Sequence, residues 1–170
     1  MHREDYINLF YADASHFSLI PSVRRAWQRK DEEILLPSAR SFALSVFGIM
    51  NLDCKLYAEV FEGTLNSEKI IAVIDKFVPH IRKQTILVID NAPVHHSKEF
   101  QRKIEEWKEQ DLYIYFLPTY SPELNKIEIL WRFIKYDWLP FDAYTNLQNL
   151  KERLNDVLLN VGGKYTINFY

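Results

Sequence analysis

The sequence predicts an α/β domain in which helices flank a five-stranded mixed sheet, with three antiparallel strands followed by parallel βαβ units. Three observations predict this class: the first three strand-like segments are joined by short turns, the later strands alternate with helical stripes, and 170 residues can bury a full hydrophobic core. We therefore expect residues 1–170 to form one domain.

The first part of the chain contains the antiparallel strands. Tyr6 to Ala12 is nearly all apolar and predicts a buried strand that ends at Asp13. Residues 41–50 and 56–61 alternate apolar and polar side chains on either side of a short turn, which predicts a β-hairpin. A basic loop lies between the first strand and the hairpin and carries Arg24, Arg25, Trp27, Arg29 and Lys30.

The second part alternates helices and strands. Asn66 or Ser67 can cap a helix with an apolar stripe over residues 70–81, and Ser97 can cap another with its stripe over residues 100–107. Strands are predicted at residues 85–89, closed by Asp90, and at residues 112–117. Two further helices have stripes over residues 127–134 and 147–158, and Gly162-Gly163 is expected to end the last one.

Composition and charge exclude several classes of protein. No apolar run approaches the roughly 18 residues of a membrane helix, and the polar N-terminus does not resemble a signal peptide, so we expect a cytoplasmic protein without membrane contact. Cys54 is the only cysteine, which excludes an internal disulfide. The net charge of −2 argues mildly against a stand-alone nucleic-acid binder, but a divalent-cation site needs acidic residues and a separate basic domain can supply DNA affinity.

Asp13 and Asp90 each follow a buried apolar strand. A right-handed crossover would place the two strands side by side, so that the two carboxylates meet and repel each other unless a cation lies between them. The alternative for each aspartate is a solvated strand end. Asp90 could also form an Asx-type turn in which its carboxylate accepts backbone N–H groups. Periodicity leaves these alternatives open.

Three segments resemble the acidic motifs of DDE transposases: ADASHF at residues 12–17, VIDNAPVH at residues 88–95 and YSPELNKIEILW at residues 120–131. The resemblance is greatest to the bacterial insertion-sequence branch of the Tc/mariner superfamily, with its D-N-A-P-x-H and Y-S-P-x-L-N-P-I-E-x-x-W patterns. It covers essentially the whole chain, and the interval from Asp90 to Glu128 is compatible with that branch. Lys126 replaces the usual proline, and Ala14 stands where glutamate is frequent.

The resemblance implies a ribonuclease H-like fold and metal-dependent DNA cleavage and strand transfer during transposition of an insertion sequence. Asp13, Asp90 and Glu128 would be the catalytic residues and the ligands of two Mg²⁺ or Mn²⁺ ions. The implied partner is double-stranded DNA, as transposon ends and target, with a homodimer acting on paired ends. Because the helix-turn-helix region of such transposases is absent from this chain, a separate recognition polypeptide is a further expected partner. The implied setting is a bacterial cytoplasm, in association with the nucleoid.

Glu123 and Glu128 both lie in the third motif. Glu123 can favour a helix N-terminus, whereas Glu128 has a capping-box spacing from Asn125 and an ion-pair spacing to Arg132. The resemblance selects Glu128, which also flanks the buried stripe through its neighbour Trp131 and can face the sheet.

Other polar residues near the motifs are candidates for supporting roles. Asn91 can hydrogen-bond to a ligand carboxylate, and His95 fits the D-N-A-P-x-H pattern and can contact a scissile phosphate, as can His16 and His96 less securely. Surface or capping histidines remain the alternative. The predicted DNA-contacting residues are those of the basic loop, for which a solvated loop is the alternative: Arg24, Arg25, Trp27, Arg29 and Lys30.

Two rival functions remain. A ribonuclease H-like nuclease would hydrolyse DNA without strand transfer. A catalytically silent or host-adopted remnant would act only as a DNA-binding or protein-binding module.

Overall fold

The computed structural model describes residues 7–21, 43–119 and 121–169. The strands are β1 (Asn8–Ser18), β2 (Ala43–Met50), β3 (Leu56–Glu62), β4 (Thr85–Ile89) and β5 (Leu112–Phe116). The helices are α1 (Ser67–Phe77), α2 (Lys98–Lys108), α3 (Ile127–Phe133) and α4 (Leu147–Leu159). The short turns between them are the 3₁₀ elements η1 (Val78–His80), η2 (Pro93–His96), η3 (Pro122–Leu124) and η5 (Phe141–Tyr144) and the π-helical η4 (Ile134–Trp138).

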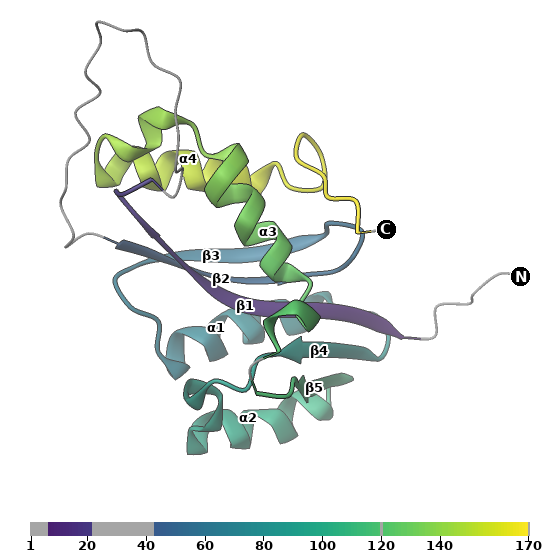
Figure 1. The fold of residues 1–170 in the computed structure, drawn as a ribbon. Helices are drawn as coiled ribbons and strands as arrows, with labels where there is room; N and C mark the ends of the chain where they lie inside the picture. The colour runs from purple at the N-terminus through teal and green to yellow at the C-terminus, as the bar shows by residue number, and fades with distance from the viewer. Residues whose placement is uncertain (1–6, 22–42, 120, 170) are drawn as a thin grey trace, which may run out of the picture.

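The strands form one sheet in the order β3-β2-β1-β4-β5 (Figure 1). β1 is antiparallel to β2, and β2 to β3, whereas β4 is parallel to both β1 and β5. The parallel strands are reached through helices, with α1 before β4 and α2 before β5, because parallel neighbours need a crossover connection. The predicted α/β class, the hairpin and the mixed sheet are confirmed.

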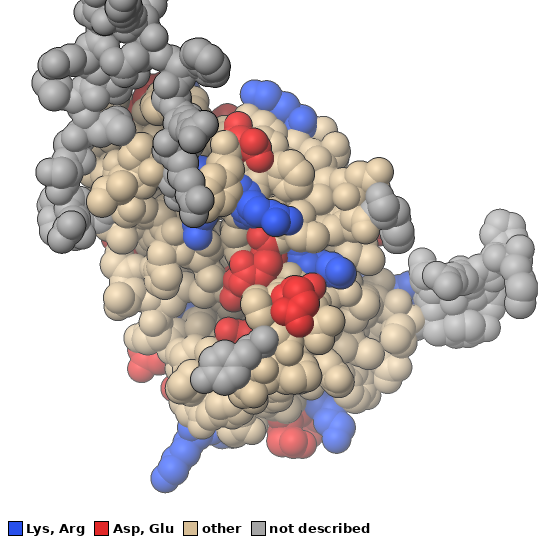
Figure 2. Space-filling model, viewed as in Figure 1, with Lys and Arg blue, Asp and Glu red and all other residues tan. Residues whose placement is uncertain are grey.

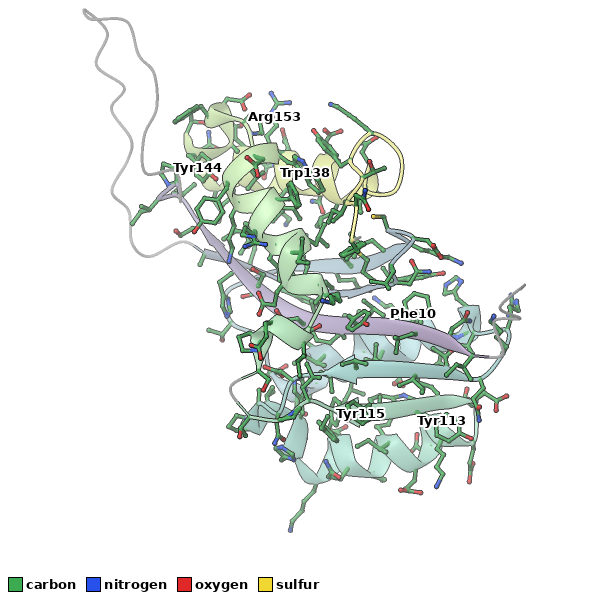
Figure 3. The ribbon with its side chains drawn as sticks, turned by 45° about the vertical axis from the view of Figure 1, so that its right-hand side comes forward. Phe10, Tyr113, Tyr115, Trp138, Tyr144 and Arg153 are labelled. Atoms are coloured by element: carbon green, nitrogen blue, oxygen red, sulfur yellow. The ribbon has the colours of Figure 1, made fainter. Side chains whose placement is uncertain are left out.

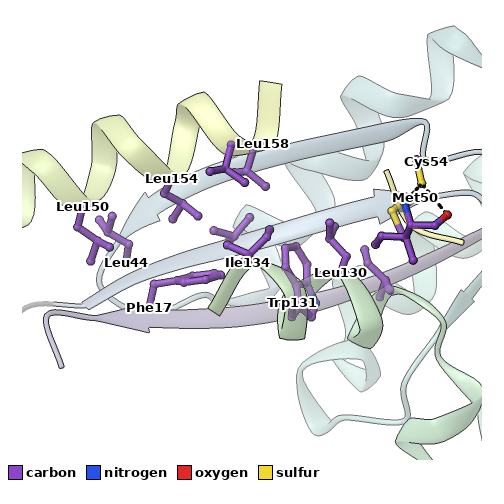
Figure 4. Close-up of a cluster of buried hydrophobic side chains, with 14 of the residues drawn as sticks. Phe17, Leu44, Met50, Cys54, Leu130, Trp131, Ile134, Leu150, Leu154 and Leu158 are labelled. Atoms are coloured by element: carbon purple, nitrogen blue, oxygen red, sulfur yellow. Dashed lines mark hydrogen bonds between the residues drawn. The ribbon is translucent and has the colours of Figure 1, made fainter. Parts of the chain in front are cut away.

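Helices cover both faces of the sheet. On one face α1 and α2 pack against Phe10, Ala12 and other strand residues. On the other face α3 and α4 pack against Tyr11 and Phe17, as Figure 4 shows for part of that core. Successive side chains of a strand point to opposite faces, so β1 contributes to both cores.

α3 depends on this packing for its stability. It has 7 residues, and a helix of that length is not stable alone in water. Its buried side chains, Ile127, Leu130 and Trp131, fix it across β1 and β2. Full burial of one such side chain contributes roughly 1.5–3 kcal/mol of transfer free energy. The position of every residue on α3, including Glu128, is therefore set by the core beneath it.

Aromatic side chains lie at both ends of the molecule. Trp107 and Trp131, predicted from their helical stripes to be core residues, are buried in the two separate cores. Trp138 and Tyr144 belong to the layer of α3 and α4, whereas Tyr115 lies on the edge strand β5 and is 57% exposed (Figure 3).

Three predicted boundaries were wrong. α1 ends at Phe77, before the end of its predicted stripe at residue 81. β1 does not end at Asp13 but continues to Ser18, because β2 pairs with it along residues 13–18, with Asp13 opposite Gly48. α4 ends at Leu159, before the two glycines. Gly162 instead has a φ of 84° in a following turn that the Gly162 N–H closes on the Tyr165 carbonyl. Among the described residues, no helix has the length and apolarity needed to cross a bilayer.

Candidate active site

Asp13 projects from the middle of β1 toward α3. The indole N–H of Trp131 donates a hydrogen bond of 3.0 Å to Oδ2 of Asp13. The pKa of Asp13 is raised from 3.8 to about 8, chiefly by burial and then by the charges of Glu128 and Asp90. Hydrogen bonds with the Ala14 backbone and with Trp131 oppose this rise. Asp13 is thus a partly buried acid near two other carboxylates, where a bound cation would favour its ionised form.

Asp90 follows β4 directly. Because β4 is parallel to β1, Asp90 emerges beside Asp13, as expected from a right-handed crossover. Nε2 of His95 lies 3.0 Å from Oδ1 of Asp90, and the Ala92 backbone N–H donates to the same oxygen at 3.4 Å. The hydrogen bond from His95 is the main reason that the pKa of Asp90 is lowered, although partial burial opposes it. The Asx-type contact considered for Asp90 is therefore present, but the main hydrogen-bond partner of Asp90 is His95.

His95 is buried beneath Asp90. The residue is 3% exposed, and its ring packs on that of Phe100, with the ring centroids 5.2 Å apart. When Nε2 carries the proton that it donates to Asp90, Nδ1 of the neutral ring is an acceptor, and among the described residues this buried atom has no hydrogen-bond partner. The geometry gives His95 a role in holding Asp90.

The other two histidines near the motifs have different partners. Nε2 of His96 lies 2.5 Å from Oδ1 of Asn91, and the ring stacks on Phe116. Asn91 therefore faces His96, and in the described part of the chain no hydrogen bond joins it to a carboxylate of the motifs, contrary to expectation. Nδ1 of His16 hydrogen-bonds to Oγ of Ser45 on β2.

Glu128 lies in the first turn of α3 and is exposed. Within the described ranges, no ion pair joins it to Arg132, and the Asn125 side chain does not cap the helix. The charge of Glu128 acts on Asp13, whereas that of Glu123, on the exposed turn η3, is not among the causes of the Asp13 pKa rise. The effect on the Asp13 pKa thus favours Glu128 over Glu123 as the third acid of the site, as the motif does.

The three acids line two adjoining recesses. A cleft of about 440 Å³ is lined by Asp90 and Glu128, together with Asn91 and Asn125. A smaller recess of about 300 Å³ contains Asp13 and Asp90 together with His16 and His95. Asp90 borders both recesses. Figure 2 shows acidic and basic side chains gathered in the middle of this face of the molecule.

The acids are not arranged as a complete metal-binding set. Over the described residues, no group of three or more His, Cys, Asp or Glu side chains is placed so that it could hold one ion. Their chemistry nevertheless fits Mg²⁺ or Mn²⁺, since both ions prefer carboxylate oxygens, and burial followed by the charges of Glu128 and Asp90 raises the pKa of Asp13. The metal-ligand roles of Asp13, Asp90 and Glu128 stay predictions.

Lys135 is a cation that the sequence reasoning missed. It lies on η4, half-buried, in a groove that it shares with Glu128 and Trp131. Burial lowers the pKa of Lys135, and the charges of Glu128 and Asp13 partly offset that effect. Its place two helical turns after Glu128 is a sequence signal that could have identified it.

The predicted DNA-contacting loop is outside the described residues, and so are all of its candidates: Arg24, Arg25, Trp27, Arg29 and Lys30. Their DNA contacts stay predictions.

Solved structures with similar folds include transposase and integrase complexes. The Mos1 strand transfer complex matches with a TM-score of 0.64 and 12% identity over 95% of this chain and 51% of that chain. The catalytic domain of Mos1 mariner transposase matches with a TM-score of 0.59 and 12% identity, covering 89% and 70%. An intasome of simian T-cell lymphotropic virus in complex with the PP2A regulatory subunit B56 gamma matches with a TM-score of 0.59 and 11% identity, covering 95% and 50%.

These similarities confirm the expected ribonuclease H-like fold, shared with transposase and integrase cores. The chain spans about half the length of the Mos1 chain in the strand transfer complex. No curated protein sequence matches this one. The sequence model of the DDE superfamily endonucleases matches residues 8–151, which include Asp13, Asp90 and Glu128. The chain therefore belongs to the DDE superfamily endonuclease family.

Proposed function

We propose that this chain is the catalytic domain of an insertion-sequence transposase that cleaves DNA at the element's ends and joins them to target DNA. The observation that carries the proposal is the position of Asp13: in a DDE endonuclease domain, it lies partly buried beside Trp131 and Asp90, where burial and then the charges of Glu128 and Asp90 raise its pKa. An acid in this setting favours a bound divalent cation, which is what phosphoryl transfer requires.

Asp13, Asp90 and Glu128 would hold Mg²⁺ or Mn²⁺, in a two-ion arrangement. Structures of the Mos1 paired-end complex have been solved with Mn and with Mg, which supports this choice. When bound, the ions would polarise the scissile phosphate and assist both the attacking and the leaving oxygen. The acids act as ligands, and the attacking group changes from water in cleavage to a DNA 3′-hydroxyl in joining.

Other side chains of the chain prepare the site. His95 donates an N–H to Asp90 and keeps that carboxylate ionised. Trp131 donates to Asp13 and shields it from water on the α3 side. Lys135, beside Glu128, offers a positive charge to a DNA phosphate, and the basic residues Arg24 and Arg25 would add backbone contacts farther along the duplex.

Double-stranded DNA is the proposed partner. The Mos1 matches include a strand transfer complex and a paired-end complex with the left transposon end, which supports DNA ends and a target as substrates. A homodimer would hold two ends together. Because the chain spans about half of the Mos1 chain, we propose that a recognition region, on the same or a separate polypeptide, supplies the sequence specificity.

The test is an end-cleavage and joining assay. The protein, with a recognition region joined or added, is incubated with labelled duplexes that carry the repeats flanking its coding sequence, an unlabelled target duplex and Mg²⁺. The proposal expects cut ends and labelled joined product, both lost in Glu128→Gln and both kept in the matched control Glu123→Gln. Cleavage without joining would instead indicate a hydrolytic nuclease. Binding without cleavage would indicate a silent DNA-binding module.

A further inference from the structure

Two hydrogen bonds connect α3 and the turn before it to successive residues of β1. The indole N–H of Trp131 donates to Oδ2 of Asp13 at 3.0 Å, and the side-chain amide of Asn125 donates to the carbonyl oxygen of Ala12 at 3.0 Å. Both donors are buried, with Trp131 2% and Asn125 3% exposed. Glu128 lies between them in the chain. The helix that carries one proposed ligand is therefore tied to the strand that carries another.

Gly48 makes room for the Trp131 contact. It pairs with Asp13 across the β1–β2 ladder, and a Cβ atom at this position would lie 2.7 Å from Cη2 and 3.0 Å from Cζ2 of Trp131. A real Cβ atom essentially never lies closer than 3.0 Å to such a neighbouring atom, so the indole ring occupies the space that a side chain at position 48 would need. Glycine inside a strand weakens the sheet and often marks such a close approach.

We propose that Trp131, seated on Gly48, is a positioning residue that orients the Asp13 carboxylate relative to Glu128, and that Asn125 fixes the same helix to the β1 backbone. The proposal rests on the proposed function for its catalytic consequence, because orientation of Asp13 matters only if Asp13 binds metal. Groups that hydrogen-bond to metal ligands fix their orientation, and removing them typically costs 10–100-fold in metal affinity or activity.

The alternative is that Trp131 is only a core residue whose N–H happens to be satisfied. The molecule contains a matched example of that case. Trp107 on α2 is 0% exposed, and its indole N–H donates to Oδ1 of Asp75 on α1 at 2.7 Å. Trp107 lies in the other core of the molecule, whereas Asp75 is exposed and also pairs with Lys103, and among the described hydrogen bonds and ion pairs neither contacts a proposed ligand. Trp107→Phe therefore removes the same kind of hydrogen bond from a site without a proposed catalytic role.

The experiment compares Mn²⁺ binding by the wild-type chain, Trp131→Phe and Trp107→Phe, using calorimetry and thermal melts. Both variants should remain folded with a similar loss of stability. We expect Trp131→Phe to weaken Mn²⁺ binding by about 10–100-fold and Trp107→Phe to leave it unchanged. Asn125→Ala should weaken binding in the same direction as Trp131→Phe. Unchanged Mn²⁺ affinity in Trp131→Phe would overturn the proposal.

A double variant separates packing from positioning. Gly48→Ala alone should displace the indole, lowering both stability and Mn²⁺ affinity. Phenylalanine lacks the two ring atoms that a Cβ at position 48 would meet, so Gly48→Ala with Trp131→Phe should be more stable than the sum of the single effects. Mn²⁺ affinity should stay low because the N–H is still missing. Recovery of affinity together with stability would show that only packing matters, against the proposal.

A final measurement keeps this inference distinct from the proposed function. If the wild-type chain binds no Mn²⁺ with or without DNA, the metal mechanism fails, and the contact is then judged from the indole N–H resonances in a ¹⁵N spectrum. Asp13→Asn should shift the Trp131 resonance and speed its exchange with solvent, while that of Trp107 stays in place. An unmoved Trp131 resonance would mean that the indole does not hold Asp13.

Discussion

The two aspartates of the site are held in opposite ways by the two halves of the molecule that meet there. On the α3 side, Asp13 is partly buried, accepts a hydrogen bond from Trp131 and has its pKa raised to about 8. On the β4 side, Asp90 is half-exposed, accepts a hydrogen bond from His95 and has its pKa lowered. The acids lie on adjacent parallel strands, so the difference arises from what packs over each one.

This contrast shows that, without a bound metal, the ionised form is disfavoured at Asp13 and not at Asp90. Asp90 is already stabilised as an anion by its hydrogen bonds, whereas the hydrogen bonds of Asp13 do not offset burial and the neighbouring carboxylates, so a cation or a proton would stabilise Asp13 further. A bound metal would therefore compete with a proton at Asp13. At Asp90 it would bind a carboxylate that hydrogen bonds already keep ionised.

The largest expected effect is on catalysis. Asp13→Asn and Asp90→Asn each remove a ligand charge while keeping side-chain size, so end cleavage should fall by at least about a thousandfold, equivalent to about 4 kcal/mol of transition-state stabilisation. Gel assays with labelled end duplexes measure this decrease. Binding of end DNA should persist. Normal metal-dependent cleavage by either variant would contradict the three-acid site.

The next effect concerns His95, the partner of Asp90. His95→Leu removes the N–H that holds the carboxylate, so cleavage should fall by about 10–100-fold. His95→Gln, which restores a side-chain N–H donor, should recover part of the rate. The surface control His96→Gln removes a ring that contacts Asn91 and Phe116 but not Asp90, and it should retain near-normal cleavage. An equal decrease in cleavage by His95→Leu and His96→Gln would show that the loss does not come from the hydrogen bond to Asp90.

DNA affinity should change less. Arg24→Ala with Arg25→Ala, and separately Lys135→Ala, should weaken binding of a duplex several-fold and reduce the salt dependence by roughly one counterion for each phosphate that the protein no longer neutralises. Fluorescence anisotropy across a salt series measures both quantities. Lys126→Ala serves as a control for the removal of a single positive charge on the same segment. An unchanged salt slope in Lys135→Ala would argue against a phosphate contact there.

The smallest effect is on stability, and its sign differs between the two acids. Asp13 has a folded-state pKa above its ordinary value, so the folded state binds more protons between about pH 4 and 8 and its stability falls as pH rises through that window. Asp90 has a lowered pKa, so it contributes stability at neutral pH that is lost only in acid. In EDTA at pH 8, Asp13→Asn should raise Tm and Asp90→Asn should lower it, each by a few degrees at about 2–4 °C per kcal/mol.

Thermal melts from pH 5 to pH 9 check this prediction, with the difference between wild type and Asp13→Asn isolating the titration of Asp13. A difference that stays constant with pH would show that the Asp13 pKa is not raised. Mg²⁺ should raise the wild-type Tm more at pH 8 than at pH 6, because fewer protons then compete for Asp13.

The sequence predicted most of the fold because the relevant signals are local. The strand at residues 85–89 is a short apolar run closed by Asp90, and its predicted bounds are those of β4. The first strand was predicted too short, because its continuation past Asp13 depends on pairing with β2, which no local pattern reveals. Residue type predicted Ser97 as one N-cap and left Asn66 and Ser67 as candidates for the other, and Ser97 and Asn66 are the observed caps.

The supporting residues of the site were harder to predict. Trp131 lies on a helical stripe and was correctly predicted to be buried, but its bond to Asp13 spans 118 positions and depends on how α3 crosses the sheet. Asn125 was considered as half of a capping box, whereas its amide reaches across to Ala12. A lone glycine inside the β2 pattern, Gly48, was the available signal of a close approach.

The most direct test of the central claim is the location of bound Mn²⁺. Crystals of the chain, alone or with end DNA, would be soaked in MnCl₂ and anomalous difference maps calculated near the manganese absorption edge. We predict manganese peaks bounded by the carboxylates of Asp13, Asp90 and Glu128, with Glu123 away from them. Manganese held by Glu123 in place of Glu128, or peaks only at sites remote from Asp13 and Asp90, would contradict this account.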